Sequence, residues 1–534
     1  MKKIFLFAIF VLMAAAHANA QLMLRGNKFS PLFKLQLAEQ AISQLYVDTV
    51  NDNKLVEDAI RGMLEKLDPH SSYTDAKETK AFNEPLAGDF EGIGVQFNIM
   101  EDTLVVIQPV VNGPSEKVGI MSGDRIIAVN DTAIAGVKMA QSDIMKRLRG
   151  KKGTLVNLTV VRPGVAEPLH FTVKRAKIPV HSVTASYMIR PGIGYIRIEN
   201  FGAKTYQEFM DAVNTLRQQG MKNLMLDLQD NGGGLLISAV SIVNEFLRKG
   251  DMIVYTQGRA QDKQTYKAHG DGKLQDLGVV VLVNELTASA AEITSGAIQD
   301  QDRGLIVGRR TFGKGLVQRP VNFPDGSMMR LTVAHYYTPS GRCIQKPYTK
   351  GDLKDYEMDL ETRLKHGELT NKDSIHFADS LKYITLRKHR TVYGGGGIMP
   401  DVFVPLDTMK YTRLHRRLVA KSIVIKQCLK YIDSHRDELR KAYPSFAAFR
   451  ENYEVPQALL DTIFADGKRQ KIVPKDADEQ KRTLPYLKVQ LKALIARDLW
   501  TMNEYFEVWN EQSDIVQKGL EIMQDKTMKR FLKP

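Results

Sequence analysis

Residues 278–299 read GVVVLVNELTASAAEITSGAIQ, and this stretch sets the expected fold. Its first six residues carry no polar side chain, which predicts a strand that is buried on both faces. Residues 284–287 predict a turn, and residues 288–299 predict a helix. A buried strand that leads directly into a helix is typical of an α/β layer built on a largely parallel sheet.

The same alternation continues on both sides of this stretch. Further strands are predicted at 193–198, 223–228 and 305–307, with a helix at 205–219. Glycine-rich turns follow two of these strands, at 230–234 and after residue 307. Ligands of such sheets bind in the loops beyond the carboxyl ends of the strands. The two glycine turns and the turn Thr287–Ala291 therefore predict one shared active site.

Composition divides the chain into five segments. We expect a signal peptide at 1–20, an N-terminal helical region at 21–85, a small and mostly β domain at 86–176, the α/β core at 177–408 and a helical C-terminal region at 410–534. The β segment is indicated by short β-rich runs separated by Gly, Pro, Asn and Asp. The C-terminal segment is indicated by apolar residues that recur at the helical period.

The N-terminus predicts export. Lys2 and Lys3 precede an apolar run, residues 4–16, and Ala18-Asn19-Ala20 follows as a small-x-small cleavage signal. This is the pattern of a secretory signal peptide, and the run is shorter than the roughly 20 residues of a membrane-spanning helix. We expect the mature chain to begin at Gln21, to span no membrane and to lie in the periplasm or outside the cell.

Composition excludes several classes of protein. The 534 residues are 43% hydrophobic and 25% charged, unlike a disordered, collagenous or polytopic membrane protein. The net charge is +14, and residues 410–534 hold 25 Lys and Arg against 17 Asp and Glu. Because acidic residues are interleaved with the basic ones, we expect a solvated helical surface and no nucleic-acid binding. Cys343 and Cys428 are too few for a four-cysteine zinc site, and whether they pair is left open.

Ser289 is the first candidate for catalysis. It lies at the predicted strand-to-helix turn among small residues, where the amides and dipole of a helix N-terminus stabilise a developing negative charge. A serine nucleophile needs such an environment, because acyl transfer passes through an oxyanion. A serine in this position is also a common helix N-cap, so the local pattern alone leaves both roles open.

Lys314 is the candidate base. It lies between Gly313 and Gly315 after a buried strand, where burial would lower its pKa and let the neutral amine accept a proton. A surface lysine is the alternative, and His335 is expected to be a core or sheet-face residue rather than the base. Residues 308–314 also match most of a phosphate-binding loop. However, Gly315 replaces the Ser or Thr that holds magnesium, and a strand rather than a helix is predicted next.

Six ordered motifs, between about residues 35 and 405, resemble those of the C-terminal processing (tail-specific) serine peptidases. They are Leu67–Tyr73, Gly92–Val95 with Gly113–Asp124, Asp227–Gly234, Ser289–Ile293, Thr311–Gln318 and Thr338–Arg342, and Tyr393–Asp401 is a further match. The spacing of 25 residues between Ser289 and Lys314 is that of the family. Two positions depart from the pattern: Gln229 stands where the family usually has arginine, and Ala291 where it often has serine.

The resemblance implies a multidomain α/β protein with a crotonase-like peptidase core and an inserted PDZ domain. It implies an exported serine endopeptidase that cleaves proteins near their C-termini. Ser289 would be the nucleophile, Lys314 the base, and Gln318 the residue that positions Lys314. The backbone amides of Ala290 and of Gly232 or Gly233 would form the oxyanion hole. No metal or organic cofactor is implied.

The PDZ resemblance adds an expectation about the substrate. Residues Gly92, Ile93, Gly94 and Val95 are expected to bind the carboxyl terminus of a protein or peptide substrate. The alternative function is a catalytically inert, PDZ-containing scaffold that only binds peptides. The region 410–534 lies outside the common match, and we expect it either to pack on the core or to bind an adaptor or a second copy of the chain.

Overall fold

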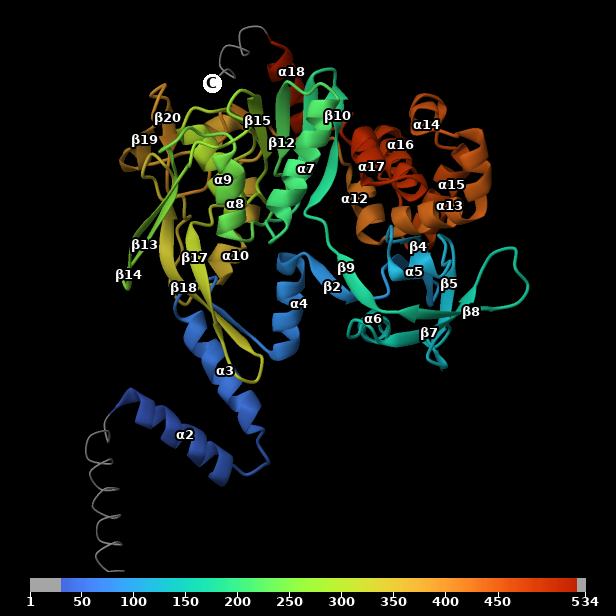
Figure 1. The fold of residues 1–534 in the computed structure, drawn as a ribbon, viewed down its shortest axis with the longest axis horizontal. Coiled ribbons are helices and arrows are strands. Elements are labelled where there is room, and N and C mark those ends of the chain that lie inside the picture. Colours follow the sequence, from blue (N-terminus) through green and yellow to red (C-terminus); the bar gives the residue numbers. More distant parts are fainter. Residues whose placement is uncertain (1–29, 526–534) are drawn as a thin grey trace, which may run out of the picture.

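The buried strand predicted at 278–283 lies inside a six-stranded sheet in the computed structural model, which describes residues 30–525 (Figure 1). The strands are, in sheet order, β10 (Val183–Arg190), β11 (Ile193–Ile198), β12 (Asn223–Asp227), β15 (Gly278–Val283), β16 (Leu305–Gly308) and β21 (Val402–Phe403). Strands β11 to β21 run parallel to their neighbours, and β10 is antiparallel to β11. The predicted largely parallel sheet is confirmed.

Helices cover both faces of this sheet. One face carries α7 (Thr205–Gln218), α8 (Leu236–Asn244) and α9 (Ala290–Asp300). The other carries α18 (Asp514–Gln524), whose Ile515, Val516 and Leu520 pack on Met225 and Leu282 of the sheet. A Cβ at Gly519 would lie 2.9 Å from Met225 Cε, so α18 approaches the sheet closely. The last helix of the described residues is thus part of the α/β core.

A second sheet lies beside the first and carries residues of the candidate site. It contains, in order, β1 (Ser72–Thr74), β18 (Met328–Tyr337), β13 (Met252–Gly258) and β14 (Gln261–Lys267), and β17 (Leu316–Asn322) also pairs with β18. The strand β17 directly follows Gly315, as predicted, so the segment 308–315 does not open a helix. Strand β1 was not predicted: it interrupts the N-terminal helical region and pairs antiparallel with β18.

The predicted β domain forms a separate sheet with its own core. Its strands are β3 (Val95–Met100), β4 (Thr103–Pro109), β5 (Arg125–Val129), β7 (Leu155–Val161) and β8 (Leu169–Lys174), with β6 (Thr132–Ala133) beside β5 and the helices α5 (Pro114–Lys117) and α6 (Gln141–Leu148). A ribbon of β2 (Asp89–Gly92) and β9 (Ala176–Pro179) connects it to the core (Figure 1). Between β2 and β3 the chain turns at Ile93 and Gly94, where Gly94 has φ 74°.

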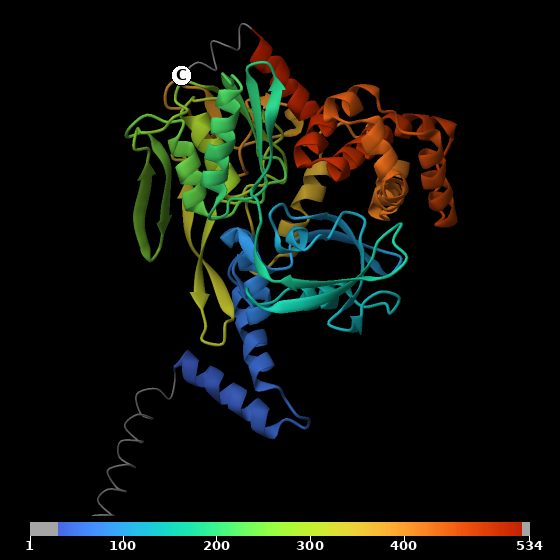
Figure 2. The ribbon, with the colours of Figure 1, turned by 45° about the vertical axis from the view of Figure 1, so that its right-hand side comes forward.

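The N-terminal region has three helices, the first of which lies away from the core (Figures 1 and 2). They are α2 (Pro31–Leu45), α3 (Asp52–Glu65) and α4 (Ala76–Ala87). No residue of α2 is buried, whereas α4 returns to the core and continues into β2. The signal peptide predicted at residues 1–20 lies outside the described residues.

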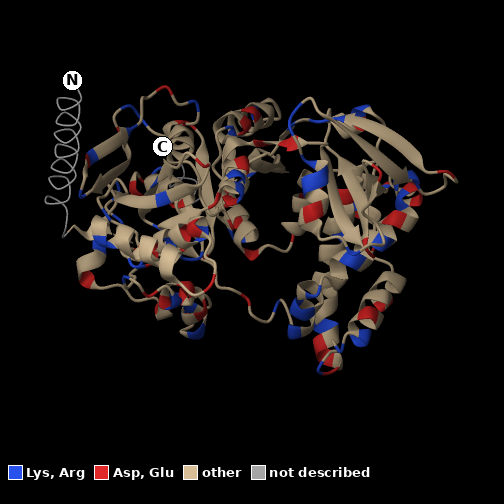
Figure 3. Cartoon of the chain, turned by 90° about the horizontal axis from the view of Figure 1, so that it is seen from below, with Lys and Arg blue, Asp and Glu red and all other residues tan. Residues whose placement is uncertain are grey.

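The C-terminal helices form a second core of their own beside the β domain (Figure 1). They are α12 (Arg413–Ala420), α13 (Ile423–Ala442), α14 (Phe446–Asn452), α15 (Gln457–Arg469), α16 (Ala477–Leu499) and α17 (Met502–Trp509). Helix α17 packs on β10, while Asp433 and Lys430 of α13 form ion pairs with Arg125 and Glu101 of the β domain. Acidic and basic residues are mixed throughout the coloured chain in Figure 3. The helical C-terminal region is therefore confirmed, and it bridges the core and the β domain.

The remaining elements lie between β18 and α12. They are α10 (Lys354–Glu357), α11 (Asp359–Lys365), two short 3₁₀ helices (Lys372–Ser374 and Asp379–Leu381) and the hairpin of β19 (Lys382–Ile384) and β20 (Thr391–Tyr393). Both cysteines, Cys343 and Cys428, are free thiols.

Candidate active site

Ser289 lies at the tight turn between β15 and α9. Its backbone has φ 56° and ψ −117°, a conformation that is costly for a residue with a Cβ. It occupies the N-cap position of α9, and its main-chain oxygen accepts a hydrogen bond from the Tyr336 hydroxyl at 3.2 Å. The strained conformation is held by its surroundings, as is common where a side chain must be presented for chemistry.

Glu292, one turn into α9, holds this strained turn in place. Its carboxylate is fully buried and accepts four hydrogen bonds. Oε2 accepts the amides of Ser289 at 2.8 Å and Lys314 at 2.9 Å, and Oε1 accepts the Gly313 amide at 2.8 Å and the Thr311 hydroxyl at 2.5 Å. One buried carboxyl group therefore links the backbone at Ser289 directly to the backbone at Lys314.

The first glycine turn packs directly against Ser289. A Cβ on Gly233, which has φ 99°, would lie 2.6 Å from Ser289 Cβ, so only glycine fits there. The Gly233 amide donates to Asn231 Oδ1 at 2.8 Å, and the Ala288 amide donates to the Asn231 main-chain oxygen at 2.9 Å. Asn231 thus joins the two turns. The Gly233 amide is already used, which leaves the amide of Gly232 as the available donor of this pair.

An arginine from a neighbouring strand supports the glycine turn at the position of Gln229. Arg197 in β11 donates to Asp227 Oδ2 at 2.8 Å and to the Gln229 main-chain oxygen at 2.9 Å. Asp227 in turn accepts the Gln229 amide at 2.9 Å. The turn therefore has a cationic support although residue 229 itself is not an arginine.

Lys314 lies in the second glycine turn with its side chain largely buried. Burial is the main cause that lowers the pKa of its ammonium below the ordinary 10.5, and the charge of Arg330 acts in the same direction. Glu292 and Asp68 act against this shift. The net result is an amine that loses its proton more readily than a surface lysine, which a general base requires.

The Gln318 side chain bonds to Thr332 of β18, and no hydrogen bond joins it to Lys314 within residues 30–525. Its Nε2 donates to Thr332 Oγ1 at 3.2 Å, and Thr332 Oγ1 donates to Asp68 Oδ1 at 2.8 Å. Asp68 also accepts the Ser71 hydroxyl at 2.5 Å. The N-terminal motif Leu67–Tyr73 therefore reaches the strand pair β17–β18 next to the site.

A cavity of about 520 Å³ brings the predicted residues together. Ser289, Ala290, Lys314 and Gln318 line it with the glycine turn 232–234. Phe82 and Leu86 of α4 and Arg330 of β18 complete its walls. Residues from four distant parts of the sequence thus face one cleft that is large enough for several residues of a peptide.

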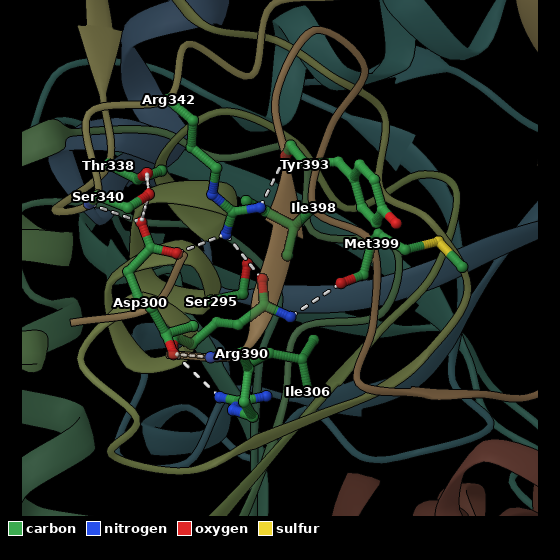
Figure 4. A network of polar contacts seen from close by, with 12 residues as sticks. Ser295, Asp300, Ile306, Thr338, Ser340, Arg342, Arg390, Tyr393, Ile398 and Met399 are labelled. Carbon is green, nitrogen blue, oxygen red and sulfur yellow. Dashed lines mark hydrogen bonds and ion pairs between the residues drawn. The ribbon is translucent and has the colours of Figure 1, made fainter. Parts of the chain in front are cut away.

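The far end of α9 is anchored by a buried polar network (Figure 4). Arg342, fully buried, donates to Asp300 Oδ1 at 2.7 Å, to Gln299 Oε1 at 2.7 Å and to the Tyr393 main-chain oxygen at 2.7 Å. The Ser340 hydroxyl donates to Asp300 Oδ2 at 2.6 Å. The helix that begins at the candidate nucleophile is thus fixed at its C-terminus by the motif Thr338–Arg342.

The β domain has a small cavity of about 90 Å³ at its edge strand β3. It is lined by all four predicted residues, Gly92, Ile93, Gly94 and Val95, and by Met145 and Leu148 of α6. The Ile93 side chain is 3% exposed and belongs to the domain core, so it forms the floor of this cavity rather than a free wall. An edge strand beside a helix is a place where an extended peptide can be added.

The structure brings together Ser289, Lys314 and the glycine turn that the sequence singled out, but the sequence pattern assigned no role to three residues that support them. The roles of Glu292, Asn231 and Thr332 depend on contacts across 19 to 264 positions of sequence, which no local pattern records. His335 lies in β18, where its Nδ1 is 3.7 Å from Cys343 Sγ. It does not line the cavity and was correctly placed on the sheet.

Within residues 30–525, no group of three His, Cys, Asp or Glu side chains is arranged to hold a metal ion. Over the same residues, no helix combines the length and apolar character that crossing a bilayer requires.

Family models match four parts of the chain. Residues 192–355 match peptidase family S41, and residues 92–174 match the PDZ domain. Residues 12–79 match the N-terminal domain of the activating protease CtpB, and residues 414–501 match a family of unknown function.

Known proteins with similar sequences are described as carboxy-terminal processing proteases. The carboxy-terminal processing protease CtpA of Bacillus subtilis (strain 168) is 37% identical over 344 residues, 63% of this chain and 73% of that protein. The carboxy-terminal-processing protease of Bartonella bacilliformis is 37% identical over 327 residues, 60% of this chain and 74% of that protein. A solved photosystem II D1 C-terminal processing protease is 28% identical, covers 69% of this chain and 92% of its own, and has a TM-score of 0.34. The chain belongs to peptidase family S41 and is a serine-type peptidase of the carboxy-terminal processing group, with a PDZ domain.

Proposed function

We propose that this chain is an exported endopeptidase that cleaves proteins near their C-termini with a Ser/Lys dyad. Ser289 Oγ attacks the scissile carbonyl carbon while neutral Lys314 Nζ accepts its proton. The amides of Gly232 and Ala290 hold the oxyanion. Lys314 then gives its proton to the leaving amine, and a water molecule hydrolyses the acyl-enzyme with Lys314 again as base.

The observation that supports this proposal most strongly is the shared cavity. It is lined by Ser289, by Lys314 with its lowered pKa, and by the glycine turn. The Ala290 amide is favourable for an oxyanion because the first amides of a helix lack an intrahelical acceptor. The contact of Gln318 with Thr332 supports an indirect role, in which Gln318 helps to fix the strand beside Lys314.

Cleavage of an unfolded protein tests the proposal. The wild-type chain should release fragments whose ends mass spectrometry can map, and Ser289→Ala, which removes only the hydroxyl, should release none above the background rate. A catalytically inert peptide-binding scaffold would give no cleavage with either chain. Equal cleavage by both chains would exclude Ser289 as the nucleophile.

We also propose that the PDZ domain selects substrates by their free carboxyl terminus. The cavity at β3 offers an edge strand, the amides around Gly94 and an apolar floor, which suit a terminal carboxylate with an apolar last side chain.

A substrate with a free apolar C-terminus should be cleaved about 10-fold faster than the same chain amidated or ending in aspartate. Amidation removes the charge, and a terminal aspartate would place a second charge in an apolar pocket. Equal rates for the three substrates would contradict selection by this domain.

Export and the role of residues 410–534 complete the proposal. The pattern at residues 1–20 supports secretion. Comparing the mass of the chain in the cell with its mass in the exported fraction tests whether this segment is removed.

The bridging position of α13 and α17 supports a structural role for 410–534, with binding of an adaptor or a second copy as a further role. Binding of an adaptor or a second copy is tested by measuring the mass of the full chain in solution, both for the chain purified alone and for the chain captured from its own cells.

A further inference from the structure

A second cation, Arg330, lines the active-site cavity beside Lys314. It lies in β18, opposite Ser72 of β1, and it is close enough to Lys314 and His70 for its charge to act on both. Its guanidinium forms no ion pair with a carboxylate of residues 30–525. An arginine that is partly buried without a counter-charge is unusual.

The guanidinium is held on one side and unpartnered on another. Nη2 donates to the Ser72 hydroxyl at 2.8 Å, and the ring of Phe82 lies against its face, with its centre 4.0 Å from Cζ. Nε is buried and has no hydrogen-bond acceptor. Two neighbours therefore fix the plane of the group, while Nη1, which is not buried and has no hydrogen-bond partner within residues 30–525, is left to meet a ligand in the cavity.

The two acidic groups that act on the neighbouring Lys314, Asp68 and Glu292, are already engaged by other donors. Asp68 is the nearest acidic group of the motif that contains Ser72, and its oxygens already accept the His70 amide and the hydroxyls of Ser71 and Thr332. Glu292 is occupied by its four donors. The apolar walls of the cavity, including Phe82 and Met328, strengthen the attraction for an anion by lowering the local dielectric constant.

We propose that Arg330 binds a carboxylate group of the substrate inside the catalytic cleft and thereby sets a preference for acidic groups near the scissile bond. This inference rests on the proposed function, because it needs a peptide bound across Ser289. A carboxylate offers two oxygens in the geometry that a guanidinium matches. The group is either the terminal carboxylate of the peptide or the side chain of Asp or Glu.

Three peptides with one cleavable bond separate these sources. The parent peptide is amidated and has neutral side chains; the second has a free terminal carboxylate; the third is amidated and carries Glu in place of Gln next to the scissile bond. Each is cleaved by the wild type, by Arg330→Met, which keeps length without charge, and by Arg319→Met. Arg319 is an exposed arginine on the neighbouring strand β17 and is the matched control.

We expect the wild type to cleave at least one carboxylate peptide about 10- to 100-fold faster in kcat/KM than the parent, as a charge-assisted pair predicts. Arg330→Met should bring this ratio close to one, and Arg319→Met should keep the wild-type ratio. The peptide that shows the effect identifies the source. A preference that the PDZ domain causes would persist in Arg330→Met. A ratio near one in the wild type, or an unchanged ratio in Arg330→Met, would overturn the inference.

A binding measurement covers the case in which Arg330→Met cleaves nothing. Fluorescence anisotropy of the labelled peptides on Ser289→Ala and on Ser289→Ala/Arg330→Met gives the same comparison without turnover. The affinity for the carboxylate peptide should fall about 10-fold in the double variant, while that for the parent should not change. Failure of the proposed function would appear differently, as absence of cleavage by the wild type or as equal cleavage by Ser289→Ala.

Discussion

Lys314→Arg should lower kcat/KM by about 10³-fold or more, because it retains a positive charge but cannot lose its proton near neutral pH. The residual rate would come from the oxyanion hole and from substrate binding. The measurement is kcat/KM on one peptide substrate, with circular dichroism to show that the variant is folded. Lys263→Arg, at an exposed lysine in β14, is the matched control and should keep the wild-type rate.

The same assignment predicts the direction of the pH dependence. Neutral Lys314 is the active form, so kcat/KM should rise with pH through a pKa that burial holds below 10.5. His70, a neighbour of Lys314, does not contribute to this rise, because burial lowers its pKa to about 3 and it is neutral throughout the range. A Lys314→Arg enzyme with near-normal turnover, or a wild-type rate that falls as the pH rises from 7 to 9, would exclude Lys314 as the base.

The sequence predicts the parallel sheet well because its signal is local. The run at 278–283 has to be buried on both faces, and in the structure its side chains pack alternately on α7–α9 and on α18. The boundaries fail where tertiary contacts override the local pattern. The helix predicted from residue 288 begins at Ala290, because Ser289 is held in a conformation outside the helix by Glu292.

The short elements show the same limit. Strand β1 has three residues and exists only because β18 offers its edge, a partner more than 250 positions away. The covering of the core sheet by α18 could not be predicted either, since the amphipathic pattern of a helix shows that one face is buried but not against which surface. The candidate catalytic residues Ser289 and Lys314 were predicted from ordered motifs, whereas the residues that support them depend on distances that only the fold defines.

Glu292→Gln should lower kcat by about 10²-fold or more with little change in KM, because it disconnects the two proposed catalytic residues from each other. Oε2 of Glu292 accepts the amides of both Ser289 and Lys314. In the variant, an NH₂ group at this position would face two N–H donors. Leaving them unsatisfied should cost about 2–4 kcal/mol of stability, and displacing a reacting group by about 1 Å costs about 10²-fold in rate. Glu285→Gln, which weakens the largely buried ion pair between Glu285 and Arg309 in the turn before Ser289, is the matched control: it should also cost stability, but kcat should stay within about twofold.

The pH dependence gives Glu292 a signature that a merely structural residue would lack. Burial raises the pKa of Glu292 to about 7, above its ordinary 4.5. The native state therefore binds a proton more strongly than the unfolded state between these values, and the free energy of unfolding should fall as the pH rises from 4.5 to about 7.

The activity should rise over the same pH range in which the free energy of unfolding falls. Protonation below pH 7 removes the negative charge that accepts the amides of Ser289 and Lys314, so kcat should decrease as the pH falls through this value. Glu292→Gln should lack both effects, while the rise at higher pH that we assign to Lys314 should persist in its residual activity. If the variant kept the acidic limb of the wild-type profile, another group would have to hold the two turns together.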